Sequence, residues 1–183
     1  MRWRTTPQQW GWLTILIHWM TALTVFGLFG LGLWMVELDY YSPWYRKGPD
    51  LHKSIGILLF TLTVARLELR RIEGRAEALA SHSPREQKLA HLVHGLFYLL
   101  LIAVMMAGYF ISTADGRAIE VFGLFSIPAT LHGIDKQEDI AGLIHLWLAI
   151  SLISLVVLHA GAAIKHHFFD RDRTLKRMFG SDN

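Results

Sequence analysis

The chain has 183 residues, of which 52% are hydrophobic and only 18% are charged, and its mean hydropathy is +0.32. Soluble domains carry about 25% charged residues, so this composition excludes an ordinary soluble globule and predicts a single membrane domain over residues 1–183. The absence of cysteine excludes disulfides, iron–sulfur clusters and covalently attached c-type haem. Ten histidines are many for this length, and histidine is the commonest metal ligand.

Four stretches predict membrane-spanning helices. Three of them, residues 13–36, 89–112 and 140–164, contain no Asp, Glu, Lys or Arg. The second in chain order, residues 52–69, spans only if the charged side chains at its ends extend to the interface. Because a backbone in lipid must satisfy its own hydrogen bonds, we expect an all-α, antiparallel four-helix bundle. The apolar stretch 122–129 is too short to cross and is expected at the membrane interface.

Lysine and arginine are distributed unequally between the two sides of this predicted bundle. Thirteen fall on the side of the termini: Arg2, Arg4, Arg66, Arg70, Arg71, Arg75, Arg85, Lys88, Lys165, Arg171, Arg173, Lys176 and Arg177. Five fall on the other side: Arg46, Lys47, Lys53, Arg117 and Lys136. The positive-inside rule therefore predicts that both termini are cytoplasmic. The net charge of +3 follows from this sorting, and we expect membrane lipid rather than nucleic acid as the surroundings.

Histidines occur at two depths of the predicted bundle. His145 and His159 are 14 residues apart, so they share one face of the fourth span about 21 Å apart along its axis. His18 lies at the depth of His159, and His52 lies near the depth of His145. Two such pairs are what two stacked b-type haems need, because each iron takes one imidazole from each of two helices. Glycines such as Gly32 leave room for a porphyrin or for close helix packing.

The spacing leaves open which histidines hold the inner haem. His91 and His94 share the depth of His18 and His159, and any two of the four could serve. We prefer His18 with His159, because the fourth span then serves both haems from one face.

In that arrangement His94 is free to donate a hydrogen bond or relay a proton to a quinone. His166 is a weaker expectation as a partner of a propionate or a quinone. Three other histidines are expected to be solvated: His82, His132 and His167.

Several runs resemble the bacterial cytochrome b561 family, the four-helix di-haem membrane cytochromes. They are Ile17-His18-Trp19-Met20, Leu51-His52-Lys53-Ser54-Ile55-Gly56, Ala65-Arg66-Leu67, Phe122-Gly123-Leu124-Phe125-Ser126-Ile127-Pro128, His145, Leu158-His159-Ala160 and the tail from Ile164 to Asp172. The resemblance covers nearly the whole chain, and the second run and the tail are specific when taken together.

The resemblance implies that His18 pairs with His159 and that His52 pairs with His145. It implies ubiquinone near the cytoplasmic haem, close to His94 and His166. A branch of the family acts as superoxide oxidase, in which superoxide is oxidised at the outer face and ubiquinone is reduced inside. We therefore expect an oxidoreductase of the bacterial inner membrane and respiratory chain that takes electrons from a periplasmic donor, with superoxide first among the candidates.

Four basic residues have expected roles in that function. Arg66, at the cytoplasmic end of the second span, is expected to hold a propionate or a quinone. Arg46, Lys47 and Lys53 surround His52 in the sequence and would attract an anion to the outer haem. Acidic residues in the same loop weaken this expectation of electrostatic steering.

Two other functions remain open at this stage. The chain could be the electron-transfer membrane anchor of a periplasmic dehydrogenase or hydrogenase, which would make a periplasmic redox protein its partner. It could also be a haem-free protein for metal transport or proton relay. The first and last spans contain no carboxylate, which disfavours a pathway for hard cations.

Overall fold

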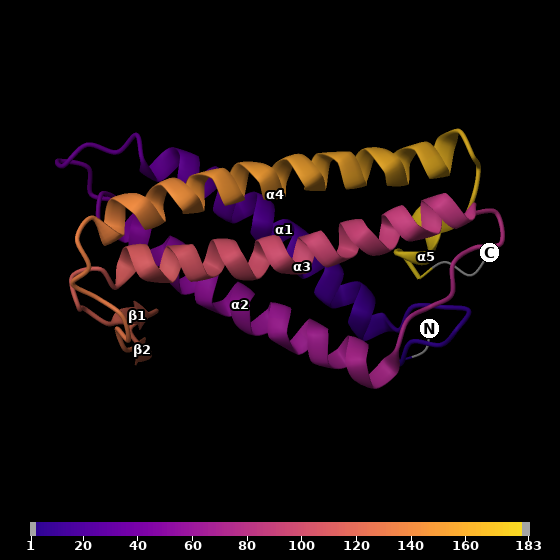
Figure 1. The fold of residues 1–183 in the computed structure, drawn as a ribbon, viewed down its shortest axis with the longest axis horizontal. Coiled ribbons are helices and arrows are strands. Elements are labelled where there is room, and N and C mark those ends of the chain that lie inside the picture. The colour runs from indigo at the N-terminus through magenta and orange to yellow at the C-terminus, as the bar shows by residue number, and fades with distance from the viewer. Residues whose placement is uncertain (1–2, 181–183) are drawn as a thin grey trace.

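The computed structural model describes residues 3–180, and four long helices form most of it (Figure 1). They are α1 (Trp12–Met35), α2 (Lys47–Glu73), α3 (Pro84–Ser112) and α4 (Gln137–Phe168). Two short strands, β1 (Ile119–Val121) and β2 (Phe125–Ile127), and a short helix, α5 (Thr174–Arg177), complete the described part. Consecutive long helices run in opposite directions, so both ends of the chain lie at the same end of the molecule (Figure 1).

Three of the helices in the described residues are long and apolar enough to cross a membrane, namely α1, α3 and α4. Their outward faces carry large exposed apolar side chains such as Leu99, Trp147 and Leu158, as a lipid-facing surface requires. Helix α2 has 27 residues but carries charged side chains in its first and last turns, and it does not belong to this apolar set. The expectation of a mainly helical membrane protein is confirmed at this level.

Helices α2, α3 and α4 are longer than the predicted spans, and the residues at the ends of α2 and α3 explain where these helices stop and start. Helix α3 begins at Pro84, where Ser83 and Glu86 form a capping box: the Glu86 N–H donates to the Ser83 hydroxyl, and the Ser83 N–H donates to the Glu86 carboxylate. Helix α2 ends at Gly74, whose positive φ of 77° suits glycine and stops the helix. Helix α2 also begins five residues before His52, so this histidine lies inside the helix.

Part of the apolar stretch 122–129 forms the second strand of a small antiparallel hairpin, an element that the sequence prediction did not include. Strands β1 and β2 pair Ile119 with Ile127, and the connecting residues Phe122 and Gly123 both have positive φ, which matches the twist of a tight hairpin. The hairpin docks on α2 because the Phe122 N–H donates to the hydroxyl of Ser54 at 3.1 Å. Ser54 lies two residues after His52 in α2, so the hairpin lies beside the part of the helix that carries this histidine.

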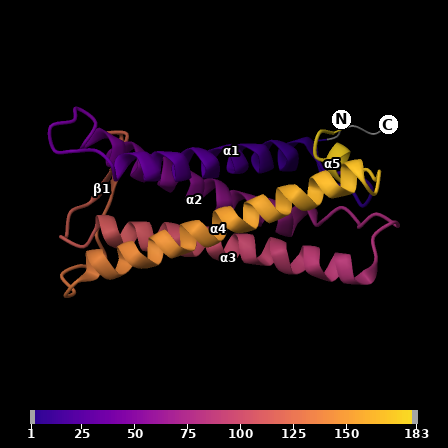
Figure 2. The same cartoon turned by 90° about the horizontal axis from the view of Figure 1, so that it is seen from above.

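The helices pack as two pairs. Helix α1 lies along α2 and α3 lies along α4, whereas α1 and α4 contact each other only sparsely (Figure 2). A small apolar core joins all four helices near mid-length: Val25, Leu59, Leu101, Val104 and Leu152. The histidines of α1, α2 and α4 lie on either side of this core along the helix axes. The imidazoles of α1 and α2 face those of α4, where helices of the two pairs contact each other least.

Candidate functional site

The first group of imidazoles lies at the end of the molecule away from the termini. His52 of α2 and His145 of α4 face each other with ring centres 6.1 Å apart. Val104 of α3 holds the second ring, because the Nδ1 of His145 makes a 2.8 Å hydrogen bond with its carbonyl oxygen. This contact orients the ring and leaves its Nε2 free, as in many metal-binding histidines. The Nδ1 of His52 is buried and has no hydrogen-bond partner among residues 3–180.

Two glycines make room for this pair. A Cβ at Gly108 of α3 would lie 3.2 Å from the Cε1 of His145, closer than an ordinary van der Waals contact. A Cβ at Gly32 of α1 would lie 3.5 Å from the Cε1 of His52. The ring of His145 can therefore lie this close to the α3 backbone only because position 108 has no side chain. The sequence prediction considered Gly32 but missed Gly108, which could have been found by matching its depth to that of His145.

The second group lies toward the termini and contains three imidazoles. His18 of α1 and His159 of α4 have ring centres 6.4 Å apart. His94 of α3 lies on another side of His159, with ring centres 5.7 Å apart, and Phe97 also contacts that ring at 5.3 Å. His91 does not join the group: it is exposed, and its Nδ1 bonds the carbonyl of Gln87 in its own helix. Of the four histidines that the sequence places at the inner depth, the structure brings three together: His18, His94 and His159.

Arg66 reaches into this inner group from α2. Its guanidinium lies 3.2 Å from the Nδ1 of His18 and packs 5.9 Å from the ring centre of Tyr98 on α3. Arg70 lies over the same ring at 5.5 Å. A cation is therefore held next to the inner imidazoles, where it can meet an anionic group.

The spacing of both pairs fits a metal held between two imidazoles. An iron bound by two imidazole nitrogens at about 2 Å each places the two ring centres about 6.2 Å apart. The observed separations are 6.1 Å for His52 with His145 and 6.4 Å for His18 with His159. The hydrogen-bonded Nδ1 of His145 also suits a ligand that uses Nε2. The residues present therefore fit bis-imidazole haem.

The basic residues expected to steer an anion are exposed or partly exposed near the start of α2. Arg46 and Lys47 are exposed, and the ammonium of Lys47 lies 6.0 Å from the ring centre of Trp44. Lys53 forms a 2.8 Å ion pair with Asp50, which offsets part of its charge. Within the described residues, Lys53 therefore has a carboxylate partner, whereas Arg46 and Lys47 form no ion pair.

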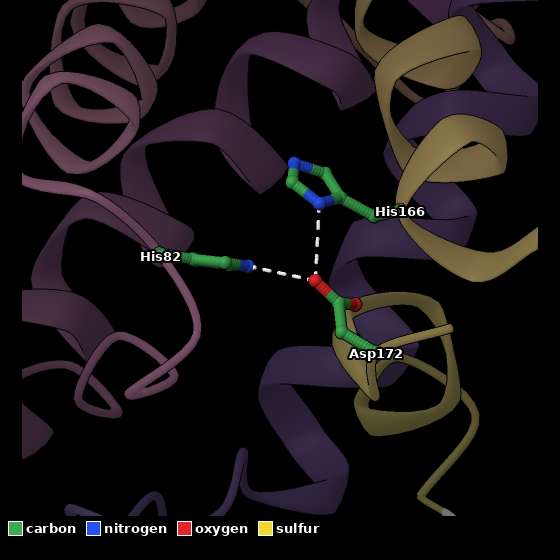
Figure 3. Close-up of side chains that lie close together, drawn as sticks. All are labelled: His82, His166 and Asp172. Atoms are coloured by element: carbon green, nitrogen blue, oxygen red, sulfur yellow. Dashed lines mark hydrogen bonds and ion pairs between the residues drawn. The ribbon is translucent and has the colours of Figure 1, made fainter. Parts of the chain in front are cut away.

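Two histidines near the termini form a cluster that the sequence prediction missed. His166 and His82 both face one carboxylate oxygen of Asp172 at 3.0 Å (Figure 3). The expectation that His82 is solvated is wrong, since only 17% of its side chain is exposed. Burial raises the pKa of the Asp172 carboxyl, but hydrogen bonds from Thr174 and His82 outweigh it and the pKa lies below its usual value.

The other histidines expected to be solvated differ from each other. His132 is exposed in the connection between the hairpin and α4. His167 is only partly exposed, and its Nδ1 is buried without a hydrogen-bond partner.

The fold and the site together define a class: a helical membrane protein whose partly buried imidazoles are paired across its helices. Residues 9–181 match the prokaryotic cytochrome b561 family, and the chain belongs to that family. It is therefore a bacterial membrane protein with the electron-transfer role of a b-type cytochrome, and family membership implies haem b.

Curated relatives agree with this assignment. The chain is 49% identical to cytochrome b561 homolog 2 of Escherichia coli strain K12, over 100% of this chain and 97% of that protein. It is 31% identical to a probable superoxide oxidase, CybB, of Yersinia pestis, over 91% and 93% of the two chains. It is 25% identical to cytochrome b561 homolog 1 of E. coli K12, over 90% and 93%.

Proposed function

We propose that this protein is a di-haem cytochrome b of the bacterial inner membrane that moves electrons from a periplasmic donor, superoxide, to ubiquinone at the cytoplasmic side. All four long helices cross the membrane in this proposal, and both termini are cytoplasmic. The excess of Lys and Arg at the end of the molecule that carries the termini supports this orientation. Arg2, one of those residues, lies outside the described part of the chain.

The observation that carries the proposal is the presence of two imidazole pairs with the same spacing at two depths. His52 with His145 binds the outer haem, and His18 with His159 binds the inner haem. Helix α4 supplies one ligand to each, because its two histidines share a face about 21 Å apart. The bound haem groups supply one-electron transfer. Held by two imidazoles each, these haems would carry electrons rather than bind oxygen.

The inner group offers partners for a quinone. His94 lies beside His159 without being needed as its partner, and we assign it to ubiquinone as a hydrogen-bond donor and proton relay. If the Nε2 of His18 held iron, its Nδ1 would carry the ring proton and could not accept from Arg66. The guanidinium is then free to hold a haem propionate or the quinone. His166 remains a weaker assignment, because its Nδ1 already faces Asp170 and Asp172.

Superoxide as the donor is supported by the relative that is named a probable superoxide oxidase. The exposed cations Arg46 and Lys47 add a source of attraction for an anion at the outer end. The reaction balances when two superoxide ions each lose one electron to give two O₂. One ubiquinone takes up the two electrons and two protons from the cytoplasm to give ubiquinol.

The first experiment measures haem per chain and the reduced-minus-oxidised spectrum of the purified protein. We expect two low-spin b haems in the unmodified chain and one in His52→Ala and in His18→Ala. His132→Ala, which alters an exposed loop histidine, is the matched control and should retain two. If His94→Ala loses a haem and His18→Ala does not, the inner pair is His94 with His159. Absence of haem from every preparation would contradict the proposal.

The donor is tested by rapid mixing of the two-haem protein with superoxide and a soluble ubiquinone analogue. We expect fast haem reduction that slows with ionic strength, and one quinol formed for two superoxide ions. Arg46→Gln with Lys47→Gln should slow the reaction several-fold at low salt only. Slow reduction with no quinol would reject superoxide and favour a membrane-anchor subunit that receives electrons from a periplasmic dehydrogenase or hydrogenase.

A further inference from the structure

A cluster of metal-binding side chains lies at the end of the molecule where the termini meet. His82 comes from the connection between α2 and α3, His166 from the last turn of α4, and Asp172 from the segment between α4 and α5. Figure 3 shows the three side chains converging from these separate segments. Their side chains are mostly buried, with 17%, 17% and 7% exposed, respectively. The cluster is separate from both imidazole pairs described above.

The donor atoms are spaced as a small metal ion requires. One carboxylate oxygen of Asp172 lies 3.0 Å from the Nε2 of His82 and 3.0 Å from the Nδ1 of His166. All three donor atoms lie within 4.8 Å of one another. A tetrahedral ion with bonds of about 2.0–2.1 Å holds neighbouring donors about 3.3 Å apart. The two distances to Asp172 are within a few tenths of an ångström of that value, and the two imidazole nitrogens lie no more than 4.8 Å apart.

A second observation separates this cluster from an ordinary hydrogen-bonded one. The Nδ1 of His166 lies 2.9 Å from Asp170 and 3.0 Å from Asp172, yet it is buried and has no hydrogen bond of acceptable geometry. A buried ring nitrogen without a partner is costly. A metal ion placed among the three donors would satisfy it.

We propose that His82, His166 and Asp172 bind one divalent transition-metal ion of the Zn²⁺ type. Two imidazoles and one carboxylate are ligands that suit zinc and its neighbours rather than magnesium or calcium. The carboxylate of Asp170 already pairs with Lys165 at 2.6 Å, so the fourth position is left to water. The bound ion links the α2–α3 connection to the C-terminal segment. This site depends neither on the number of haems nor on the electron donor.

The test uses the full-length, haem-loaded protein, purified without a polyhistidine tag and stripped of metals by chelation. Zn²⁺ is titrated against it by competition with a chromophoric chelator. We expect one ion per chain with micromolar or tighter affinity. Asp172→Asn, which keeps the shape of the side chain, and His82→Ala should each weaken binding by more than about 30-fold. His91→Ala, an exposed histidine at the same end, should change it less than about twofold.

Two further measurements separate loss of the metal site from loss of the fold and identify the metal ligands. Haem content per chain shows whether a variant has folded. X-ray absorption at the zinc edge of the unmodified protein should show two imidazoles and one or two oxygen ligands at about 2.0–2.1 Å. Absence of stoichiometric Zn²⁺ binding, or an affinity that His82→Ala and Asp172→Asn leave unchanged in haem-loaded protein, would overturn the proposal. The cluster would then be a His–Asp–His ion-paired group alone.

Discussion

Single residues set the position and orientation of the imidazole rings. Gly108, which lies next to the ring of His145, is the clearest example. The α3 backbone at Gly108 approaches the Cε1 of this ring so closely that a Cβ would lie 3.2 Å away. The carbonyl of Val104, one helical turn earlier, accepts the hydrogen bond that orients the same ring. A side chain at position 108 would therefore act on the haem ligand through its orientation, without touching iron.

We predict that Gly108→Ala impairs the outer haem site. The added methyl group pushes the ring of His145 away from His52, and close-packed interiors absorb such shifts poorly. Haem per chain should fall from two toward one, or one of two midpoint potentials should move. Gly95→Ala is the control in the same helix, since a Cβ there meets nothing within 4 Å. Equal haem content and unchanged potentials in both variants would show that the close approach has no role.

Hydrogen bonds of polar groups, rather than apolar packing, fix the start of α3 and the position of the β1–β2 hairpin. The capping box of Ser83 and Glu86 begins α3 several residues before its apolar stretch. At the opposite end of the molecule, Ser54 anchors the hairpin: it is 2% exposed and its hydroxyl accepts from Phe122. Each contact joins one element to its position with one or two hydrogen bonds, so each can be removed by a single substitution.

Removal of the capping box is expected to loosen the first turn of α3. Ser83→Ala leaves the Glu86 N–H without its acceptor and should cost about 1 kcal/mol. Backbone amide exchange in residues 85–87 should become about fivefold faster, measured by mass spectrometry in detergent. Ser81→Ala, an exposed serine of the same connection, is the control. No difference between the two variants would contradict the role of the cap.

Loss of the Ser54 hydroxyl should release the hairpin from α2. Ser54→Ala removes the acceptor of the Phe122 N–H, and we expect this amide to exchange about tenfold faster, which corresponds to about 1.4 kcal/mol. Ser126→Ala removes an exposed hydroxyl of β2 that bonds Glu120 and should change the exchange of Phe122 little. If both variants exchange at the rate of the unmodified chain, Ser54 does not hold the hairpin.

The whole molecule has one end at which distant segments of the chain converge. Arg177 of α5 donates to the carbonyl of Gln8 at 2.9 Å and to the carbonyl of Glu77 at 2.8 Å. The indole N–H of Trp19 on α1 donates to the carbonyl of Met178 at 2.8 Å. The N-terminal segment, the α2–α3 connection and the C-terminal segment are thus tied together at one end of the molecule.

The crossing of α2 can be tested because the chain contains no cysteine. We predict that, in spheroplasts, a membrane-impermeant maleimide labels Tyr41→Cys, whose native side chain is 92% exposed, before the start of α2. Ser81→Cys, beyond the end of α2, should be labelled only after lysis. Labelling of both positions from the same side would show that α2 does not cross and would reject the four-span topology.

The sequence alone determined the membrane class, the family and the two depths of histidine. These follow from local properties: hydropathy is a sum over one stretch, and the shared face of His145 and His159 follows from the helix repeat. Other features depend on contacts between distant segments, which no single stretch contains. Tertiary packing decided that His94 rather than His91 lies beside His159, because only one of the two side chains faces α4. It also placed His82 next to Asp172, 90 residues away, and folded the 119–127 hairpin onto α2.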